Sequence, residues 1–420
     1  ASATGDAEAQ EVAVRALRDA VTEGDDAADA VASLAEARVE LTYGRLAQAF
    51  DAAHAALRGS RAAADEPGTV RALCFLAKVE GYRGNLKSAT ALFDQAAQVA
   101  ALAADPTLEL LALGSGWVVA YQHRDMARGR ALAERSVSVA VKMGDRPSEA
   151  QAFGRLGISL LASDAQIADA RRYFAAAVRT YEESGDKIGT AAQAMNQSVL
   201  EARIGFFDRA VAATEKALRL FEEAVDVRGR LGALANLIYL RACAADVRGA
   251  HDAADRALDD VRLHGFGLLE ASVLENLAFA EGSVGNFDRA IELAETSFEV
   301  RSRSESMVWS SKTLADVAIW YANRGKLDSA LDAVTRLLAD DDAIVRGADW
   351  PSYCYWAAAQ VLHFAGRAGE AARPLAKANR LMRESAANLE PEDRAQFLGL
   401  PFHVDLRGAV ESGAWPDPPR

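Results

Sequence analysis

A short phrase that recurs about every 40 residues limits, more than any other feature, how this chain can fold. "GNFDRAIELAETSF" begins at Gly285, and phrases with the same layout begin at Gly84, Gly205 and Gly325. A fixed period of this size indicates a protein built from stacked copies of one small unit. When the first residue of the phrase serves as a marker, its place falls at Gly44, Gly84, Arg124, Ala165, Gly205, Ala245, Gly285, Gly325 and Gly366.

Two columns of small residues keep the same spacing as the markers. Residues seven apart lie on nearly the same face of a helix, so small side chains at both places let a neighbouring helix approach closely. We therefore predict that both columns are buried between helices. The column five residues after the marker is Ala49, Ala89, Gly129, Ala170, Ala210, Ala250, Ala290, Ala330 and Ala371. The column seven residues further on is Ala56, Ala96, Ser136, Ala177, Ala217, Ala257, Ser297, Leu337 and Ala378.

The residues around the marker predict the shape of one unit. Glycine suits the left-handed position that ends a helix. We expect Asn85 and Asn286 to cap the next helix, and Asp208, Asp288 and Asp328 to favour its N-terminal dipole. Each unit is therefore predicted to be a helix A, a tight turn, a helix B and a short connector.

Composition supports an all-α fold. Hydrophobic residues make up 50% of the chain and charged residues 25%, with good helix formers prominent and no alternating Val, Ile and Thr runs. No unit can bury its apolar face alone, but a stack can. We predict an α-solenoid of about nine stacked hairpins over residues 1–388, with a partial repeat in residues 1–25 and a capping segment and tail in residues 389–420. Pro374 predicts a kink or late start in the last helix B, and "ESGAWPDPPR" (411–420) predicts a loose end.

The columns of small residues resemble the tetratricopeptide repeat. The usual unit has about 34 residues, and the longer spacing here is similar to the long-helix version found in bacterial regulators and peptide receptors. The resemblance covers residues 5 to 388. It implies a right-handed superhelix whose concave face is lined mainly by the A helices and receives a peptide.

The segment "LEPEDRAQFLGLPFHVDLRGA" (389–409) carries a second resemblance. It is similar to the end of large ATP-binding bacterial regulators of the STAND and LuxR type and of repeat-bearing nucleotide cyclases. The matching positions are Asp393, Arg394, Phe397, Leu398 and Pro401. The resemblance implies that the chain is the sensing part of a longer transcriptional or signalling regulator.

Charge and motifs argue against several functions. A net charge of −13 without a basic block disfavours direct nucleic-acid binding, and the longest uncharged run, residues 350–366, is too short to span a membrane. The motifs GxxxxGK[ST], HExxH, GxSxG and CxxC are absent, and the histidines lack metal-ligand spacing. We expect a non-enzymatic protein without a cofactor or metal. The isolated cysteines Cys74, Cys243 and Cys354 predict reduced thiols in the cytoplasm.

Polar residues stand nine positions before four consecutive markers. An amide in the middle of a helix is mildly unfavourable, so the column calls for a reason. Its amides could bind the backbone of an extended peptide, a role that the resemblance favours, or could bond across to the next helix and fix the stacking. Both explanations stay open. The column is Asn196, Asn236, Asn276 and Asp316.

Further groove positions follow from the same helical geometry. Tyr239 and Phe279 would contact apolar ligand side chains or pack in the core. Positive side chains in the first half of the chain would attract an acidic peptide, unless they are merely solvated. The positions three and seven residues after the polar column are Val199, Arg203, Tyr239, Cys243, Phe279, Ser283, Ile319 and Asn323. The corresponding early residues are Arg38, Arg71, Lys78, Tyr82 and Arg155.

Our leading hypothesis is a scaffold that binds a peptide or protein segment in the concave groove. A second hypothesis is a small-molecule effector sensor, which a closed pocket rich in Trp and Tyr would favour. The residues that raise it are Trp309, Trp320, Trp350 and Trp356. A third is self-association through the end repeats to form a homodimer.

Overall fold

The computed structural model describes residues 7–22, 24–43, 45–122, 125–161, 167–303, 311–339, 344 and 350–420. These residues form 21 α-helices, and no β-strand occurs among them. The markers Gly44, Arg124 and Ala165, and also Trp309, lie outside the described residues.

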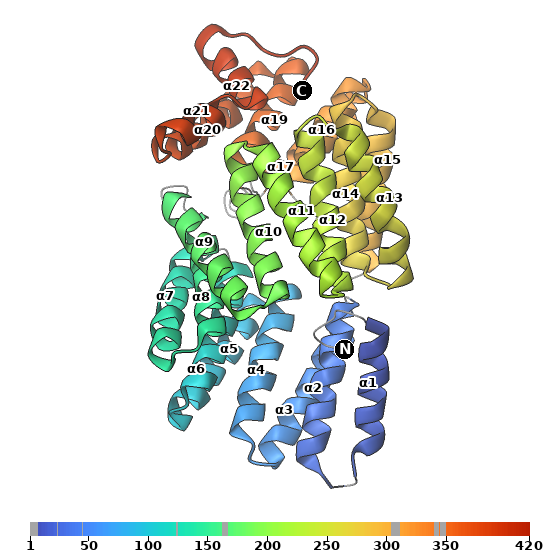
Figure 1. Cartoon of the computed structure of the whole chain (residues 1–420). Helices are drawn as coiled ribbons and strands as arrows, with labels where there is room; N and C mark the ends of the chain where they lie inside the picture. The colour runs from blue at the N-terminus through green and yellow to red at the C-terminus, as the bar shows by residue number, and fades with distance from the viewer. Residues whose placement is uncertain are drawn as a thin grey trace.

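Most of the helices alternate as the A and B members of antiparallel hairpins (Figure 1). The A helices are α2 (Asp26–Thr42), α4 (Glu66–Tyr82), α6 (Pro106–Gln122), α8 (Arg146–Leu161), α10 (Lys187–Ile204), α12 (Val227–Cys243), α14 (Gly267–Ser283), α16 (Ser311–Asn323) and α19 (Pro351–Phe364). The B helices are α3 (Leu46–Ala62), α5 (Leu86–Ala103), α7 (Met126–Met143), α9 (Ile167–Ser184), α11 (Phe207–Glu223), α13 (Val247–Leu263), α15 (Phe287–Arg303), α17 (Leu327–Leu338) and α20 (Ala368–Ala387). Helix α1 (Ala7–Ala20) precedes them, and α21 (Pro391–Leu398) and α22 (Pro401–Ser412) follow. The predicted all-α solenoid of stacked hairpins is confirmed.

The helix contacts show which layer is the inner one. Each A helix contacts the A helix of the next repeat, for example α4 with α6 and α12 with α14. Within the described ranges, the backbones of successive B helices stay farther apart, and long side-chain pairs such as Lys216 of α11 with Glu182 of α9 (2.8 Å) bridge them. Helices crowd together on the concave side of a curved stack and spread apart on its convex side. The A helices therefore form the inner wall of the solenoid.

Both columns of small residues are buried, as predicted. Ala210 and Ala217 of α11 are each 0% exposed, and the alanines of the other B helices are similarly enclosed. Each B helix packs against its own A helix and against the A helix that follows, as α11 does with α10 and α12. Small side chains on this face allow both contacts at once.

Where the structure describes both turns of a repeat, each turn contains a left-handed residue. The described markers take positive φ, from 62° at Ala245 to 100° at Gly205. A second series of left-handed residues lies halfway between the markers: Gly24, Ala64, Ala104, Gly144, Gly185, Val225 and Gly265. Sequence analysis missed this series because three of its members are not glycine.

Aspartates, and not the predicted asparagines, cap the helices. Asn85 and Asn286 make no cap, because their side chains donate to Glu80 (3.3 Å) and Glu281 (2.7 Å) on the preceding A helix. A column that sequence analysis overlooked performs the task at the start of the A helices, where each carboxylate accepts a backbone N–H at 2.7 to 3.3 Å. It consists of Asp25, Asp65, Asp105, Asp145, Asp186 and Asp226. The expected acidic residues Asp208, Asp288 and Asp328 do lie in the first turn of their B helices.

The last part of the chain folds back onto the stack. Helix α21 contacts α10, and Asp393 forms an ion pair with Arg171 (3.2 Å). Helix α22 packs on α19 and α20. The late start considered for the last helix B does not occur, because α20 begins at Ala368 and continues through Pro374; the kink stays a prediction. The expectation of a loose end in residues 411–420 is wrong, because the Trp415 ring stacks on His363 and Trp356.

Candidate functional site

The inner wall is formed by four columns of the A helices, spaced by four, three and four residues. In α12 these positions are Gly232, Asn236, Tyr239 and Cys243, and each other A helix supplies its equivalents. We call this surface the inner wall. A hollow of about 180 Å³ opens along it between α10 and α16. It is lined by Ser198, Val199, Ala202, Arg203, Asn236, Tyr239, Leu240, Asn276, Lys312 and Trp350.

The three asparagines of the polar column make different contacts. Asn276 donates to the backbone oxygen of Ala235 in the neighbouring A helix (2.9 Å), which fixes the stacking. Asn196 donates to Gln193 in its own helix (3.0 Å). Asn236 faces the hollow, and its side chain makes no hydrogen bond to the described part of the chain. Its donor and acceptor therefore both face the hollow without a partner among the described residues.

Asp316, the fourth member of the column, holds two repeats together. It is 4% exposed, accepts from the Tyr353 hydroxyl (2.6 Å) and pairs with Lys312 (2.7 Å). Burial, and then the charge of Asp316, raises the pKa of Tyr353 well above its usual value, so the hydroxyl stays protonated and donates.

The aromatic side chains Tyr239 and Phe279 contact each other and Lys312. The rings of Tyr239 and Phe279 lie 4.9 Å apart between centroids, and both are half-buried. The Lys312 ammonium sits 3.9 Å from the Phe279 centroid and 4.9 Å from that of Tyr239. Burial raises the pKa of the neighbouring Cys243 thiol to about 12, so it is protonated and a poor nucleophile at neutral pH.

Positive side chains gather on the first half of the inner wall. Burial lowers the pKa of Lys78, and the charges of Arg228 and Arg38 lower it further. Arg228 belongs to α12, so the curve of the stack brings α12 towards α4. Burial lowers the pKa of Arg155 to about 10, and its guanidinium lies over Gly114, where a Cβ would stand 2.6 Å from Nη1. Sequence analysis missed Arg228 because this proximity is set by superhelical curvature.

The remaining predicted residues are more dispersed. Arg71 is exposed, and Tyr82 is 50% exposed. Arg203 donates to the Leu161 carbonyl at the end of α8 (3.1 Å) and also lines the hollow. Asn323 lies at the end of α16 and donates to the backbone of Pro419 (2.7 Å).

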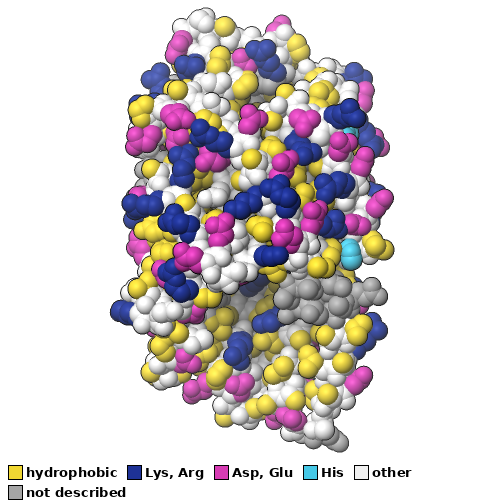
Figure 2. Space-filling view, in the orientation of Figure 1, with side chains coloured by type: hydrophobic (Ala, Val, Ile, Leu, Met, Phe, Trp, Pro, Cys, Tyr) yellow, Lys and Arg dark blue, Asp and Glu magenta, His cyan; other side chains and the backbone are white. Residues whose placement is uncertain are grey.

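The charge of the inner wall opposes that of the whole chain. Acidic and basic side chains are interspersed over the face shown in Figure 2, and the chain has 60 Asp and Glu against 47 Lys and Arg. Among the described residues of the four inner columns, the sole carboxylate is Asp316, which is already paired. The cations of these columns are Arg38, Arg71, Lys78, Arg155, Arg203 and Lys312.

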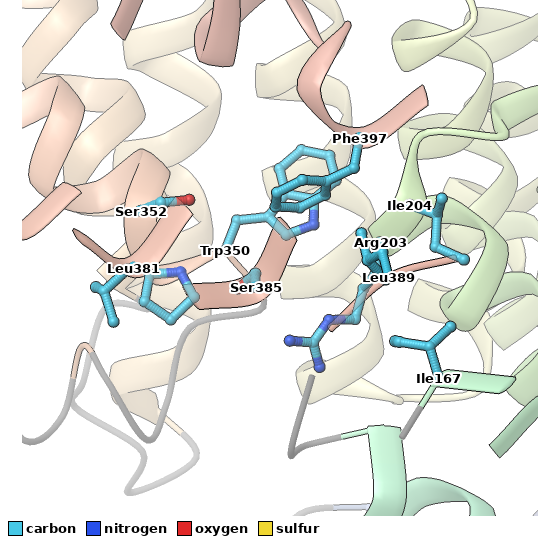
Figure 3. A pocket seen from close by; sticks show the side chains of 10 residues that line it. Ile167, Arg203, Ile204, Trp350, Ser352, Leu381, Ser385, Leu389 and Phe397 are labelled. Atoms are coloured by element: carbon cyan, nitrogen blue, oxygen red, sulfur yellow. The ribbon is translucent and has the colours of Figure 1, made fainter. Parts of the chain in front are cut away.

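A small-molecule pocket of the expected kind is not present in the described ranges. Trp350 packs on Phe207 and Phe402, Trp320 lies on Gly282, and Trp356 stacks on Trp415. The cavity that Trp350 shares with Phe397 measures about 50 Å³, and the hollow that it shares with Tyr239 about 180 Å³, against roughly 300–1,000 Å³ for ligand pockets. Larger hollows of about 400 and 490 Å³ lie beside Tyr355 and Tyr321, and no Trp lines either of them. Figure 3 shows the lining of the first of these cavities, with Trp350 and Phe397 facing Arg203, Ile204 and Ile167.

Neither a metal site nor a membrane-spanning segment is found among the described residues. The described residues contain no group of three or more His, Cys, Asp or Glu placed to hold a metal ion. No helix in the described part of the chain combines the length and apolar character needed to cross a bilayer.

Comparison with known proteins identifies the fold. No family model and no curated protein matches the sequence. Among solved structures, the apo form of RapI superposes with a TM-score of 0.54 at 12% identity, covering 84% of this chain and 98% of that one. A Rap protein complexed with competence and sporulation factor gives 0.51 at 12% identity, with 83% and 100% covered. Aspartyl phosphate phosphatase F from Bacillus subtilis gives 0.54 at 10% identity, with 86% and 94% covered. The chain therefore shares the tetratricopeptide-type helical-repeat fold with these proteins.

Proposed function

We propose that this tetratricopeptide-type solenoid is a non-enzymatic scaffold that binds an extended acidic peptide or protein segment along its inner wall. The observation that carries the proposal is the reversal of charge: six cations and one paired carboxylate line the inner columns of a chain whose net charge is −13. Cations concentrated on a concave surface attract anionic ligands even when the protein is acidic overall. A Rap protein of the same fold forms a complex with competence and sporulation factor, which supports a binding role.

The residues of the wall divide the work of binding. Arg38, Lys78 and Arg155 supply positive potential, and Arg38 and Arg155 pair with no carboxylate in the described ranges. Asn236 offers both a donor and an acceptor to a peptide backbone, independent of the side chains that the peptide carries. Asn276 and Asp316 keep the A helices in register beneath the ligand.

The setting that we propose is the sensing part of a bacterial transcriptional or signalling regulator, acting in the cytoplasm. The resemblance of residues 389–409 to the end of such regulators supports it, and so do the three free thiols. Homodimer formation through the end repeats stays a prediction. Sedimentation over a range of concentrations tests it directly.

Two pools of fluorescein-labelled heptapeptides test the proposal, one with Asp or Glu at three fixed positions and one with Lys or Arg there. Fluorescence anisotropy should rise with protein concentration for the acidic pool and stay flat for the basic pool. We expect Arg155→Gln and Lys78→Gln each to weaken binding about tenfold and to reduce its dependence on salt. Asn236→Ala should weaken binding of the acidic pool without lowering the melting temperature. Asn276→Ala should weaken binding and also lower the melting temperature.

A matched control is Arg289→Gln on the outer helix α15, where the side chain is 53% exposed and pairs with Glu292. Its binding should equal that of the unmodified protein. Equal binding of the two pools, or an equal loss in the Arg289→Gln and Arg155→Gln variants, would refute the proposal.

A further inference from the structure

Residues 413–420 lie across the inner wall of the last two A helices. The chain leaves α22 at Gly413, turns back over α19 and ends its course beside α16, near the point marked C in Figure 1. Nothing in the sequence analysis predicted this contact, because it joins residues 60 and more positions apart.

Two side-chain amides of the wall bind the backbone of this segment. Gln360 donates to the Arg420 carbonyl and accepts from the Arg420 N–H, both at 2.9 Å. Asn323 donates to the Pro419 carbonyl at 2.7 Å. Gln360 is 1% exposed, so its amide is committed to this pairing. Bonds of this kind recognise an extended backbone and leave the identity of the side chains open.

These amides belong to the inner columns already described. Gln360 stands in the column of Tyr239 and Phe279, and Asn323 in the column of Arg203. The segment therefore lies on the same surface as the proposed ligand, two and three repeats beyond Asn236.

One aromatic side chain anchors the segment. The Trp415 ring stacks on His363 at 4.1 Å between centroids with an interplanar angle of 5°, and on Trp356 at 5.3 Å and 25°. Arg420 adds two hydrogen bonds of 2.8 Å to Asp405 on α22. The Arg420 side chain is 73% exposed, so the buried contacts of the segment come from the half-buried Trp415 ring and from Pro419, which is buried.

We propose that the inner faces of α16 and α19 form a backbone-reading peptide subsite with an aromatic slot, and that residues 414–420 are its intramolecular occupant. An external extended peptide with an aromatic residue enters the subsite by displacing them. The inference rests on the proposed function only because both place a peptide on the inner wall. A tethered occupant acts at an effective concentration of about 1 mM, so external peptide binds weakly until the segment is released.

The test uses the full chain and a fluorescein-labelled peptide of sequence AWPDPPR, which copies residues 414–420. Trp415→Ala removes the ring from the tethered segment and leaves the slot intact. In fluorescence anisotropy we expect the variant to bind the peptide with 1:1 saturation, at least tenfold more tightly than the unmodified chain does. Adding Gln360→Ala to the variant should abolish binding, and a peptide with Ala in place of Trp should not bind.

A second variant protects the test against a failure to fold. Arg420→Ala removes an exposed ion pair and should also strengthen binding of the peptide, by a smaller factor. Circular dichroism and the melting temperature verify the fold of each variant. If both variants are folded and bind AWPDPPR no better than the unmodified chain does, or bind the Ala-containing peptide equally well, the subsite does not exist. Binding of the acidic pool by Arg155 and Lys78 would survive that result, so failure here is distinct from failure of the proposed function.

Discussion

Replacement of Asp316 tests how the inner wall is held together. The carboxylate is 4% exposed and lies between α16 and α19, where it binds the Tyr353 hydroxyl and the Lys312 ammonium. In Asp316→Ala the hydroxyl loses its acceptor, which costs about 1–2 kcal/mol. The ammonium loses a charged partner, and because its side chain is 25% exposed, water recovers part of that loss, leaving about 1–2 kcal/mol. We therefore expect the free energy of unfolding to fall by about 2–4 kcal/mol.

Urea unfolding followed by tryptophan fluorescence and circular dichroism measures this change. Asp316→Asn keeps an acceptor for Tyr353 and should cost only about 1 kcal/mol. A double-mutant cycle with Tyr353→Phe should give a coupling energy of about 1 kcal/mol. The control is Asp332→Ala on the exposed face of α17, which should change stability by less than about 0.5 kcal/mol. If Asp316→Ala is as stable as that control, the carboxylate does not join the two repeats.

Three further predictions follow from local geometry. Val225→Gly should raise the free energy of unfolding by about 1 kcal/mol, because Val225 takes a φ of 55° while its side chain is 65% exposed. The control Val284→Gly, at a φ of −108°, should lower the free energy of unfolding. Thermal melts of both variants measure the difference. Gly157→Ala should destabilise by about 1–3 kcal/mol, because the new Cβ would stand 2.5 Å from Phe174; Gly232→Ala, with open space at that position, should be neutral or stabilising in the same urea titration. Burial lowers the pKa of His403 to about 4, so the unfolded chain takes up a proton below about pH 6.5 that the folded chain takes up only near pH 4. The free energy of unfolding should therefore decrease as the pH is lowered from about 6.5 to about 4. Thermal melts of His403→Gln between pH 4 and 8 should show a weaker dependence on pH.

The repeat architecture could be predicted from the sequence because each unit repeats a local rule. Buried alanines such as Ala210 and Ala217 recur with the markers, and glycine occupies most of the described turns that follow an A helix. The second turn of each unit escaped notice because Val225 and Ala64 occupy a conformation that sequence alone assigns to glycine. The capping aspartates were present in the sequence as a regular column, and a search for that column would have found them.

The candidate site was less predictable because it depends on how the stack curves. The sequence placed Asn236 and Asn276 in one column, but only the distance from Asn276 to the Ala235 carbonyl shows that their roles differ. Arg228 approaches Lys78 from a repeat far along the chain. The pairing of Gln360 with Arg420 likewise follows from the path of the chain after α22, which no local pattern encodes.

Hydroxyl-radical footprinting in the presence of the acidic peptide pool tests the central claim most directly. Tyr82 is 50% exposed on the inner wall, and Leu263 is 79% exposed at the end of the outer helix α13. A ligand on the inner wall should reduce oxidation of Tyr82 as its concentration rises and leave Leu263 unchanged. Protection of Leu263 with no change at Tyr82 would place the ligand on the outer surface and contradict the account.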